Sequence, residues 1–388
     1  MLIFLFVVII YILANLYTFL TLSSIIDYGF FAEALSGLII LFMTLSPVMI
    51  PIYSNRGSEK AVRYFSYFGY MWLAFLVPFF PLTVLLDLYS YAVPHLANLL
   101  DREISSLLIS NNTSFFIPLF ISLAVNVYGY YEAQALRTER LTIRTSKLPD
   151  LRERIRMAQI SDLHLGAIVR DKMLDKVIEI IEREKPDIIV STGDLVDGII
   201  SHINHLAEKL KKVDAGLGKF AITGNHELYG GIRHTTQFLK DAGFTVLRGE
   251  GVTIDNSLNI AGMDFAGGEA HRHSKELQQR PEDEILSDLN RNLFTVLLKH
   301  RSDVKEKSLG LFDLQLSGHT HKGQIFPMNL ATTFLFQHHS GFTKLKNDAA
   351  IYVSRGTGTA GPPIRFLSTP EVTIIDIVSH KYSNAEEE

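Results

Sequence analysis

The sequence contains no cysteine. This absence excludes disulfide bridges and any metal site built on thiolates. Histidine, carboxylate and amide side chains remain as the groups able to bind a metal ion. The chain also has no excess of basic residues, because its formal net charge is −4 at pH 7. We therefore expect no nucleic-acid partner.

Charge is scarce in the first third of the chain. Residues 1–136 contain only four of the 37 basic side chains and seven of the 41 acidic side chains. A membrane-spanning helix needs about 20 predominantly apolar residues. We therefore predict an N-terminal four-helix transmembrane region, 1–136, whose apolar runs are 2–23, 35–53, 64–86 and 115–131.

The stretch 87–112 leaves two interpretations open. Leucines and isoleucine recur in it at helical spacing, with Asp101, Arg102 and Glu103 between them. It is either an amphipathic helix lying on the outer membrane surface or a partly buried loop helix. Insertion of this stretch into the membrane would instead change the number of spans.

Basic residues predict the orientation in the membrane. Arg56, Lys60 and Arg63 lie between the second and third runs, and four more basic residues occur within 137–147, after the fourth run. With four spans, both segments lie on the same side, and the positive-inside rule assigns that side to the cytoplasm. We expect a multi-pass protein of the cell inner membrane, with both termini and the large domain in the cytoplasm.

The pattern of strands and helices expected for residues 137–378 predicts an α/β domain. Strands and helices alternate at its start, a pattern typical of a parallel sheet. Short strands at 246–247, 252–254 and 258–263 then follow without helices and indicate a second sheet. We expect a two-sheet α/β sandwich, and a disordered polar tail over 379–388.

Polar side chains follow five of the predicted strands. Ligands of open α/β folds bind at the carboxyl ends of strands, and imidazole mixed with carboxylate suits divalent transition metals. The seven candidate metal ligands are Asp162, His164, Asp194, Asn225, His300, His319 and His321.

Spacing predicts how these residues share two ions. Asp162 and His164 are two residues apart, and in an extended chain such side chains face the same side. Asp194 offers two oxygens, one for each ion, and is therefore the ligand that both need. The expected sets are Asp162, His164, Asp194 and His321 for one ion, and Asp194, Asn225, His300 and His319 for the other.

Two divalent cations, with Mn, Fe or Zn expected, would make a hydrolytic centre. Ions about 3.5–4 Å apart bridge a water and lower its pKa towards neutrality, so the resulting hydroxide attacks phosphorus. His226 then either contacts the phosphate or protonates the leaving oxygen. Asp197, three residues after Asp194, is expected to cap a helix or to accept a hydrogen bond from a ligand.

The ordered motifs D-x-H, G-D, G-N-H-E, H and G-H-T-H resemble the calcineurin-like metallophosphoesterase superfamily. The resemblance covers about residues 137–378, and the run 352–371 resembles its membrane-associated bacterial branch. It implies the same division of ligands and His226 as the phosphate-facing catalytic residue, beside the shared Asp194. It also implies hydrolysis of a phosphoester or pyrophosphate, with lipid-linked and nucleotide-sugar lipid substrates as the first class to test.

Two positions depart from the usual motifs. The fourth reads H-R-S, and the fifth continues with Lys322 before Gly323. Neither change removes a ligand, but Arg301 and Lys322 can alter contacts with substrate. The alternatives to an enzyme are a sensor module whose metal site has decayed, and a transporter with an attached domain, which the lack of an ionisable cluster in the apolar runs disfavours.

Overall fold

The computed structural model describes residues 2–25, 29–55, 58–100, 107–149, 152–198, 203–265 and 280–380. Contacts divide the chain into two compact units. The helical unit comprises Met1–Tyr131, Ile325–Pro327 and Gly361–Phe366. The α/β unit comprises the rest of the chain.

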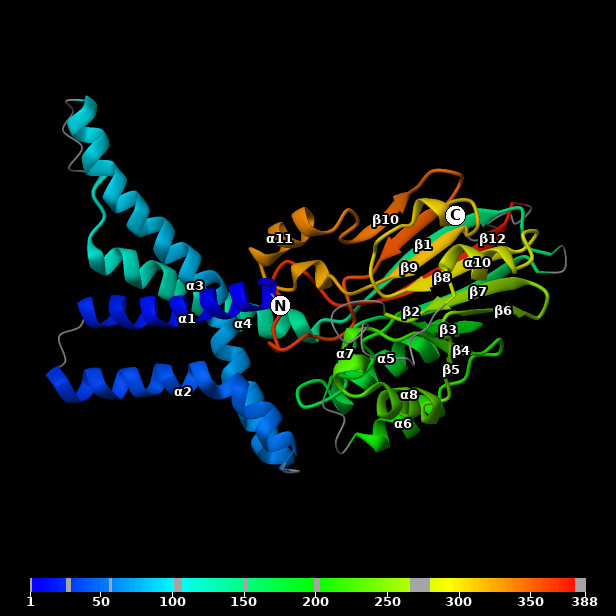
Figure 1. The fold of residues 1–388 in the computed structure, drawn as a ribbon, viewed down its shortest axis with the longest axis horizontal. Helices are drawn as coiled ribbons and strands as arrows, with labels where there is room; N and C mark the ends of the chain where they lie inside the picture. The colour runs from blue at the N-terminus through cyan, green and yellow to red at the C-terminus, as the bar shows by residue number, and fades with distance from the viewer. Residues whose placement is uncertain are drawn as a thin grey trace. The chain divides into compact units, whose positions relative to one another are not determined.

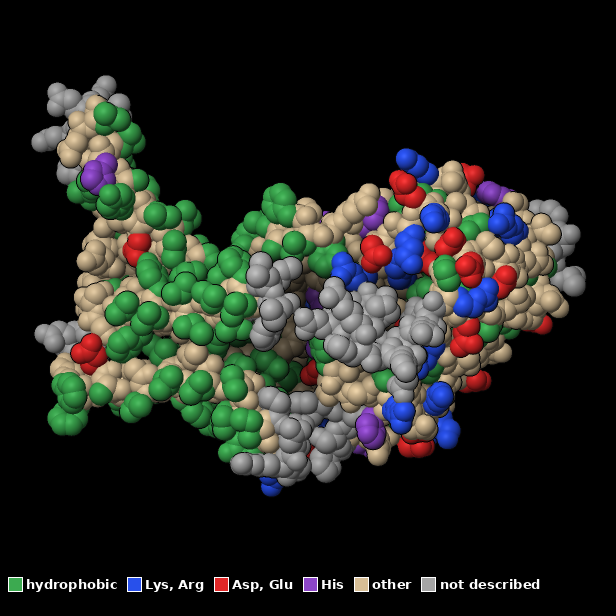
Figure 2. All heavy atoms as spheres, in the orientation of Figure 1, with side chains coloured by type: hydrophobic (Ala, Val, Ile, Leu, Met, Phe, Trp, Pro, Cys, Tyr) green, Lys and Arg blue, Asp and Glu red, His purple; other side chains and the backbone are tan. Residues whose placement is uncertain are grey.

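The helical unit contains four long helices (Figure 1). All four are long and apolar enough to cross a membrane, as predicted. Figure 2 shows hydrophobic side chains covering these helices, whereas charged side chains gather over the α/β unit. The helices are α1 (Leu2–Ile25), α2 (Gly29–Asn55), α3 (Glu59–Leu100) and α4 (Asn111–Gln134).

Of the stretch 87–112, residues 87–100 do not form the separate element that either interpretation expected, and 101–106 lie outside the described residues. Helix α3 continues to Leu100, and its 42 residues include three prolines. At about 1.5 Å per residue it is about 63 Å long, roughly twice the apolar thickness of a bilayer. Within this helix, the Asp87 carboxylate accepts a hydrogen bond from the Tyr17 hydroxyl of α1.

Two short segments from the second half of the chain pack within the helical unit. Ile325 and Ile364 are buried together with Ala74 of α3. The backbone N–H of Arg365 donates to the Gly129 carbonyl of α4 at 2.9 Å. The helical unit is therefore completed by residues that follow the last histidine motif.

The first sheet of the α/β unit carries the predicted parallel core. The sheet order is β1 (Arg137–Thr145), β12 (Glu371–Ser379), β2 (Arg154–Ile160), β3 (Ile188–Ser191), β4 (Lys219–Ala221) and β5 (Thr245–Val246). Strands β2, β3, β4 and β5 are parallel to one another. Helix α5 (Asp171–Glu184) connects β2 with β3, and α6 (Asn204–Lys211) connects β3 with β4.

The second sheet is mixed. Its four central strands are parallel, and an antiparallel strand closes each edge. The sheet order is β10 (Gly341–Lys344), β11 (Ala350–Val353), β9 (Leu314–Ser317), β8 (Phe294–Lys299), β7 (Leu258–Met263) and β6 (Glu250–Ile254).

The two sheets pack face to face around one apolar core. Met157 and Val190 of the first sheet are buried with Val296 and Leu316 of the second. The outer face of the first sheet packs on α5, α6 and α8 (Ile232–Asp241), and the second on α10 (Glu282–Ser287). The predicted two-sheet α/β sandwich is thus confirmed. Of the predicted disordered tail, Ser379 ends β12, and 381–388 lie outside the described residues.

Two helices were not predicted from the sequence. Helix α7 (Asn225–Tyr229) begins at a candidate ligand, and α11 (Met328–Leu335) follows the last histidine motif. Both are short, and neither shows a clear helical repeat of apolar residues, which is the signal that identified the longer helices.

Candidate metal centre

The structure brings all seven candidate ligands to one edge of the sandwich. Three strands of the first sheet and two of the second end there, and each is followed by a loop that carries candidates. Asp162 and His164 follow β2, Asp194 follows β3, Asn225 follows β4, His300 follows β8, and His319 and His321 follow β9.

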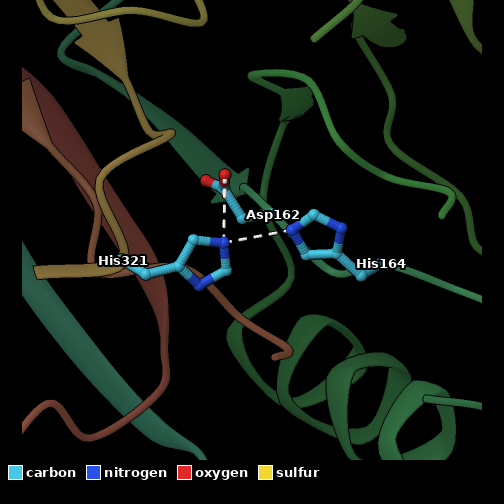
Figure 3. Close-up of side chains that lie close together, drawn as sticks. All are labelled: Asp162, His164 and His321. Atoms are coloured by element: carbon cyan, nitrogen blue, oxygen red, sulfur yellow. Dashed lines mark hydrogen bonds and ion pairs between the residues drawn. The ribbon is translucent and has the colours of Figure 1, made fainter. Parts of the chain in front are cut away.

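Asp162, His164 and His321 form the first cluster, and all three are buried (Figure 3). The Nε2 atoms of His164 and His321 lie 3.0 Å apart. The Nε2 atom of His321 is also 3.5 Å from Oδ1 of Asp162. One carboxylate and two imidazoles thus converge on one point.

Asp194, His300 and His319 form the second cluster. Nε2 of His300 lies 3.1 Å from Nδ1 of His319, 3.2 Å from Oδ1 of Asn225 and 3.4 Å from Oδ2 of Asp194. The same Oδ2 lies 3.9 Å from Nε2 of His164 in the first cluster. Asp194 therefore lies between the two clusters.

The backbone reaches this arrangement differently from the extended chain that we expected. Asp162 and His164 have φ angles of 52° and 53°, in the left-handed region, so strand alternation does not explain why their side chains converge. His319 and His321 have φ angles of 72° and 48°, and they join different clusters. Hydrogen bonds hold the strained turns, since His319 N–H donates to Asp162 Oδ1 at 3.0 Å.

Two glycines make room for the two carboxylates. A Cβ atom on Gly224 would lie 2.1 Å from Oδ1 of Asp194, and one on Gly318 would lie 2.1 Å from Oδ2 of Asp162. Both distances are far below van der Waals contact. The glycines of G-N-H-E and G-H-T-H are therefore needed for the close approach of a neighbouring loop.

Glu227 holds the Asp194 loop, a role that the sequence analysis missed. Its buried carboxylate accepts hydrogen bonds from the backbone N–H groups of Asp194 at 2.9 Å, Gly224 at 2.7 Å and Val196 at 3.2 Å. Burial, together with the nearby charge of Asp194, raises the pKa of Glu227 to about 7. The only signal in the sequence was its place directly after Asn225 and His226.

His226 lies against the first cluster. Its ring centroid is 4.4 Å from that of His164, and its backbone N–H donates to Asp194 Oδ1 at 2.8 Å. Nδ1 of His226 donates to Oδ1 of Asp197 at 2.8 Å, so Nε2 is the ring nitrogen that remains for a substrate. Burial opposes a charge on the ring, but Asp197 and Asp194 outweigh it and raise the pKa of His226 to about 9. Asp197 is thus the expected hydrogen-bond acceptor, although its partner is His226 rather than a candidate ligand.

Electrostatics separates the histidines into two kinds. Burial lowers the pKa of His164 to about 4 and that of His319 to about 3, so both stay neutral. Burial also disfavours a charge on His300, but the Asp194 carboxylate outweighs it and raises the pKa of His300 to about 10. Without ions, the His300 imidazolium is therefore the counter-charge of Asp194.

These residues fit two divalent cations. Ligand atoms about 2.0–2.1 Å from a tetrahedral ion lie about 3.3 Å apart, close to the separations of 3.0–3.5 Å within each cluster. Nδ1 of His300 donates to the Thr192 carbonyl at 2.8 Å, which presents Nε2 to the cluster. Such a bond on the far nitrogen is typical of metal-binding histidine.

Aromatic side chains border the second cluster. The ring centroids of Phe265 and Phe336 lie 6.0 Å and 5.6 Å, respectively, from the ring centroid of His319. The Arg301 guanidinium lies 5.8 Å from the Phe336 ring and is partly exposed. Arg301, singled out as a departure from the usual motif, is therefore a cation at the edge of the site.

Comparison with known proteins assigns the family. The calcineurin-like phosphoesterase family model matches residues 155–323. An uncharacterized metallophosphoesterase of Aquifex aeolicus is 41% identical over 263 residues, which cover 67% of this chain and 98% of the relative. A transmembrane protein with metallophosphoesterase domain of Danio rerio is 27% identical over 273 residues, covering 67% of this chain and 61% of the relative.

Among solved structures, a dimetal phosphatase of Danio rerio aligns with 54% of this chain and 89% of its own, at 14% identity and a TM-score of 0.34. The sequence relatives include a bacterial and an animal protein, so the likeness extends beyond the bacterial branch. The chain belongs to the calcineurin-like metallophosphoesterase family and is a metal-dependent phosphoester hydrolase.

Proposed function

We propose that the chain is a dinuclear phosphoesterase that hydrolyses a phosphoester or pyrophosphate bond at this centre. One ion is held by Asp162, His164, Asp194 and His321, and the other by Asp194, Asn225, His300 and His319. The observation that carries the proposal is the place of Asp194, whose Oδ2 lies 3.4 Å from His300 and 3.9 Å from His164, each in a different cluster. One carboxylate can therefore serve both ions.

Two bound ions would supply Lewis-acid activation of water and neutralise charge on phosphate oxygens. The residues of the chain do the rest. His226 directs Nε2 away from Asp197 and carries a proton near neutral pH, so it can bind a phosphate oxygen or protonate the leaving oxygen. Arg301 supplies a second cation at the rim.

We propose that the four apolar helices anchor the enzyme in a membrane. Their length and composition support this, as does a relative that is itself named as a transmembrane protein. A substrate whose phosphate is linked to a lipid is the class that such an anchor favours, because the substrate and the enzyme then share one surface.

The proposed location is the inner membrane of the cell, with the α/β unit in the cytoplasm. Arg56 before α3, Lys60 and Arg63 near its start, and the basic residues of β1 support this orientation. Protease added to sealed right-side-out vesicles should spare the α/β unit and should degrade it after permeabilisation. Degradation in sealed vesicles would contradict the cytoplasmic placement.

Metal removal tests the proposed activity. The purified full chain should hydrolyse a soluble aryl phosphodiester in the presence of Mn²⁺. Chelation with EDTA should abolish turnover, and Mn²⁺ should restore it, because the nucleophile depends on the ions. A parallel screen of phosphomonoesters and lipid-linked pyrophosphates identifies the preferred class.

His226→Asn is the matched control in this assay. Since His226 is not among the proposed ligands, the variant should keep its metal content while turnover falls by about 10²–10⁴-fold, the usual contribution of an acid–base side chain. A wild-type chain that hydrolyses none of these substrates with any divalent metal would support a decayed sensor module instead.

A further inference from the structure

A helix without a buried side chain follows the last histidine motif. None of the eight residues of α11 is buried. Phe334 and Leu335 are 89% and 74% exposed, and Met328 and Leu330 are about half exposed. These four side chains form the α11 surface, and Figure 2 shows hydrophobic side chains gathered over this helix. A contiguous apolar surface of this kind marks an interaction site.

Charge is absent from the whole segment around α11. Residues 323–343 contain no Asp, Glu, Lys or Arg, although charged residues are frequent elsewhere in the α/β unit. Lys322 and Lys344 flank the segment. A charge-free apolar surface between basic residues matches a bilayer interface with anionic headgroups.

Along the chain, α11 directly follows a segment of the helical unit. The helix begins directly after Ile325–Pro327, which belongs to the helical unit, and Ile325 is buried with Ala74 of α3. The eight residues of α11 span only about 12 Å along the helix axis. Every residue of α11 is therefore close, along the chain, to a unit that is apolar enough to lie in a membrane.

The other end of α11 leads to the metal centre. Phe336 directly follows the helix, and its ring packs edge-on against the His319 ring at 5.6 Å. The Thr320 hydroxyl donates to the His339 carbonyl at 2.6 Å, which fixes the chain after the helix to the histidine loop. The α11 surface is thus fixed to the rim of the metal centre.

We propose that the α11 surface lies in the headgroup region of the bilayer and presents the metal centre to phosphates at the lipid surface. The presentation of substrate rests on the proposed hydrolysis, and the contact of α11 with lipid rests on the proposed membrane anchor alone. Continuity with the helical unit favours lipid as the occupant over a second copy of the chain.

Single-cysteine labelling tests the contact, because the natural chain has no cysteine to remove. Phe334→Cys is labelled with an environment-sensitive nitrobenzoxadiazole dye in the full chain, reconstituted into phosphatidylglycerol-containing bilayers. Lys307→Cys, exposed on the short 3₁₀ helix Glu306–Ser308 that contacts α10, is the matched control. The label at 334 should shift to shorter emission wavelength, lose intensity to a lipid nitroxide near the headgroups, and be protected from aqueous iodide.

The two quenchers separate the outcomes. Equal iodide quenching at positions 334 and 307, without quenching by the lipid nitroxide, would overturn the proposal. Protection of the label at 334 from both quenchers would also overturn it, since a protein surface would then cover α11. The measurement needs no turnover, so failure of the proposed hydrolysis would leave this result unchanged.

Discussion

Asp194→Asn should remove both metal ions from the protein and lower kcat/KM by at least about a thousandfold. The Asp194 carboxylate lies between the two clusters, with Oδ2 3.4 Å from Nε2 of His300 and 3.9 Å from Nε2 of His164. Asparagine keeps the volume of the side chain but loses its charge and one of its two acceptor oxygens. Elemental analysis after gel filtration, with the aryl phosphodiester assay, measures both effects.

Asn225→Ala is the matched control for this prediction. Asn225 lies 3.2 Å from His300 in the second cluster, and its amide oxygen would serve a single ion. The variant should therefore keep about one ion per chain, because the first cluster stays intact. A normal complement of two ions in Asp194→Asn, with the fold intact by circular dichroism, would rule out the shared-ligand assignment.

Among the substitutions proposed here at residues other than the candidate ligands, Glu227→Ala should cause the largest loss of stability in the α/β unit. It leaves three buried N–H donors without a partner, at about 1–3 kcal/mol each. A loss of at least about 3 kcal/mol lowers Tm by about 6–12 °C in a domain of this size. Thermal melting of the full chain in detergent, followed by near-ultraviolet circular dichroism, measures the shift.

Glu227→Gln separates the lost hydrogen bonds from the lost charge. Glutamine keeps one acceptor oxygen, which can serve Asp194 and Gly224, the two donors that share Oε2. The amide NH₂ of glutamine then faces the N–H of Val196, which loses its acceptor. The Tm of this variant should therefore lie between those of the wild type and the alanine variant. Equal melting of wild type and Glu227→Ala would show that the Asp194 loop holds its shape without this carboxylate.

Much of this molecule can be predicted from local patterns. Four long apolar runs predict four helices, because a bilayer demands about 20 apolar residues in succession. Apolar strands followed at once by D-x-H, G-D and G-N-H-E indicate a parallel sheet with polar loops at one edge. The length of α3 was harder to predict, because three prolines and Asp87 lie within the helix and prolines usually break one.

The sequence by itself determined the four apolar helices, the sheet architecture and the set of residues that meet at the sheet edge. Periodicity and strand-end position are local properties, so the chain order was sufficient for them. The tertiary structure decided how Asp162 and His164 converge, because left-handed turns held by distant backbone partners replace the extended geometry. It also decided the role of Glu227 and the exposure of α11, since both depend on what the rest of the fold places, or leaves open, around them.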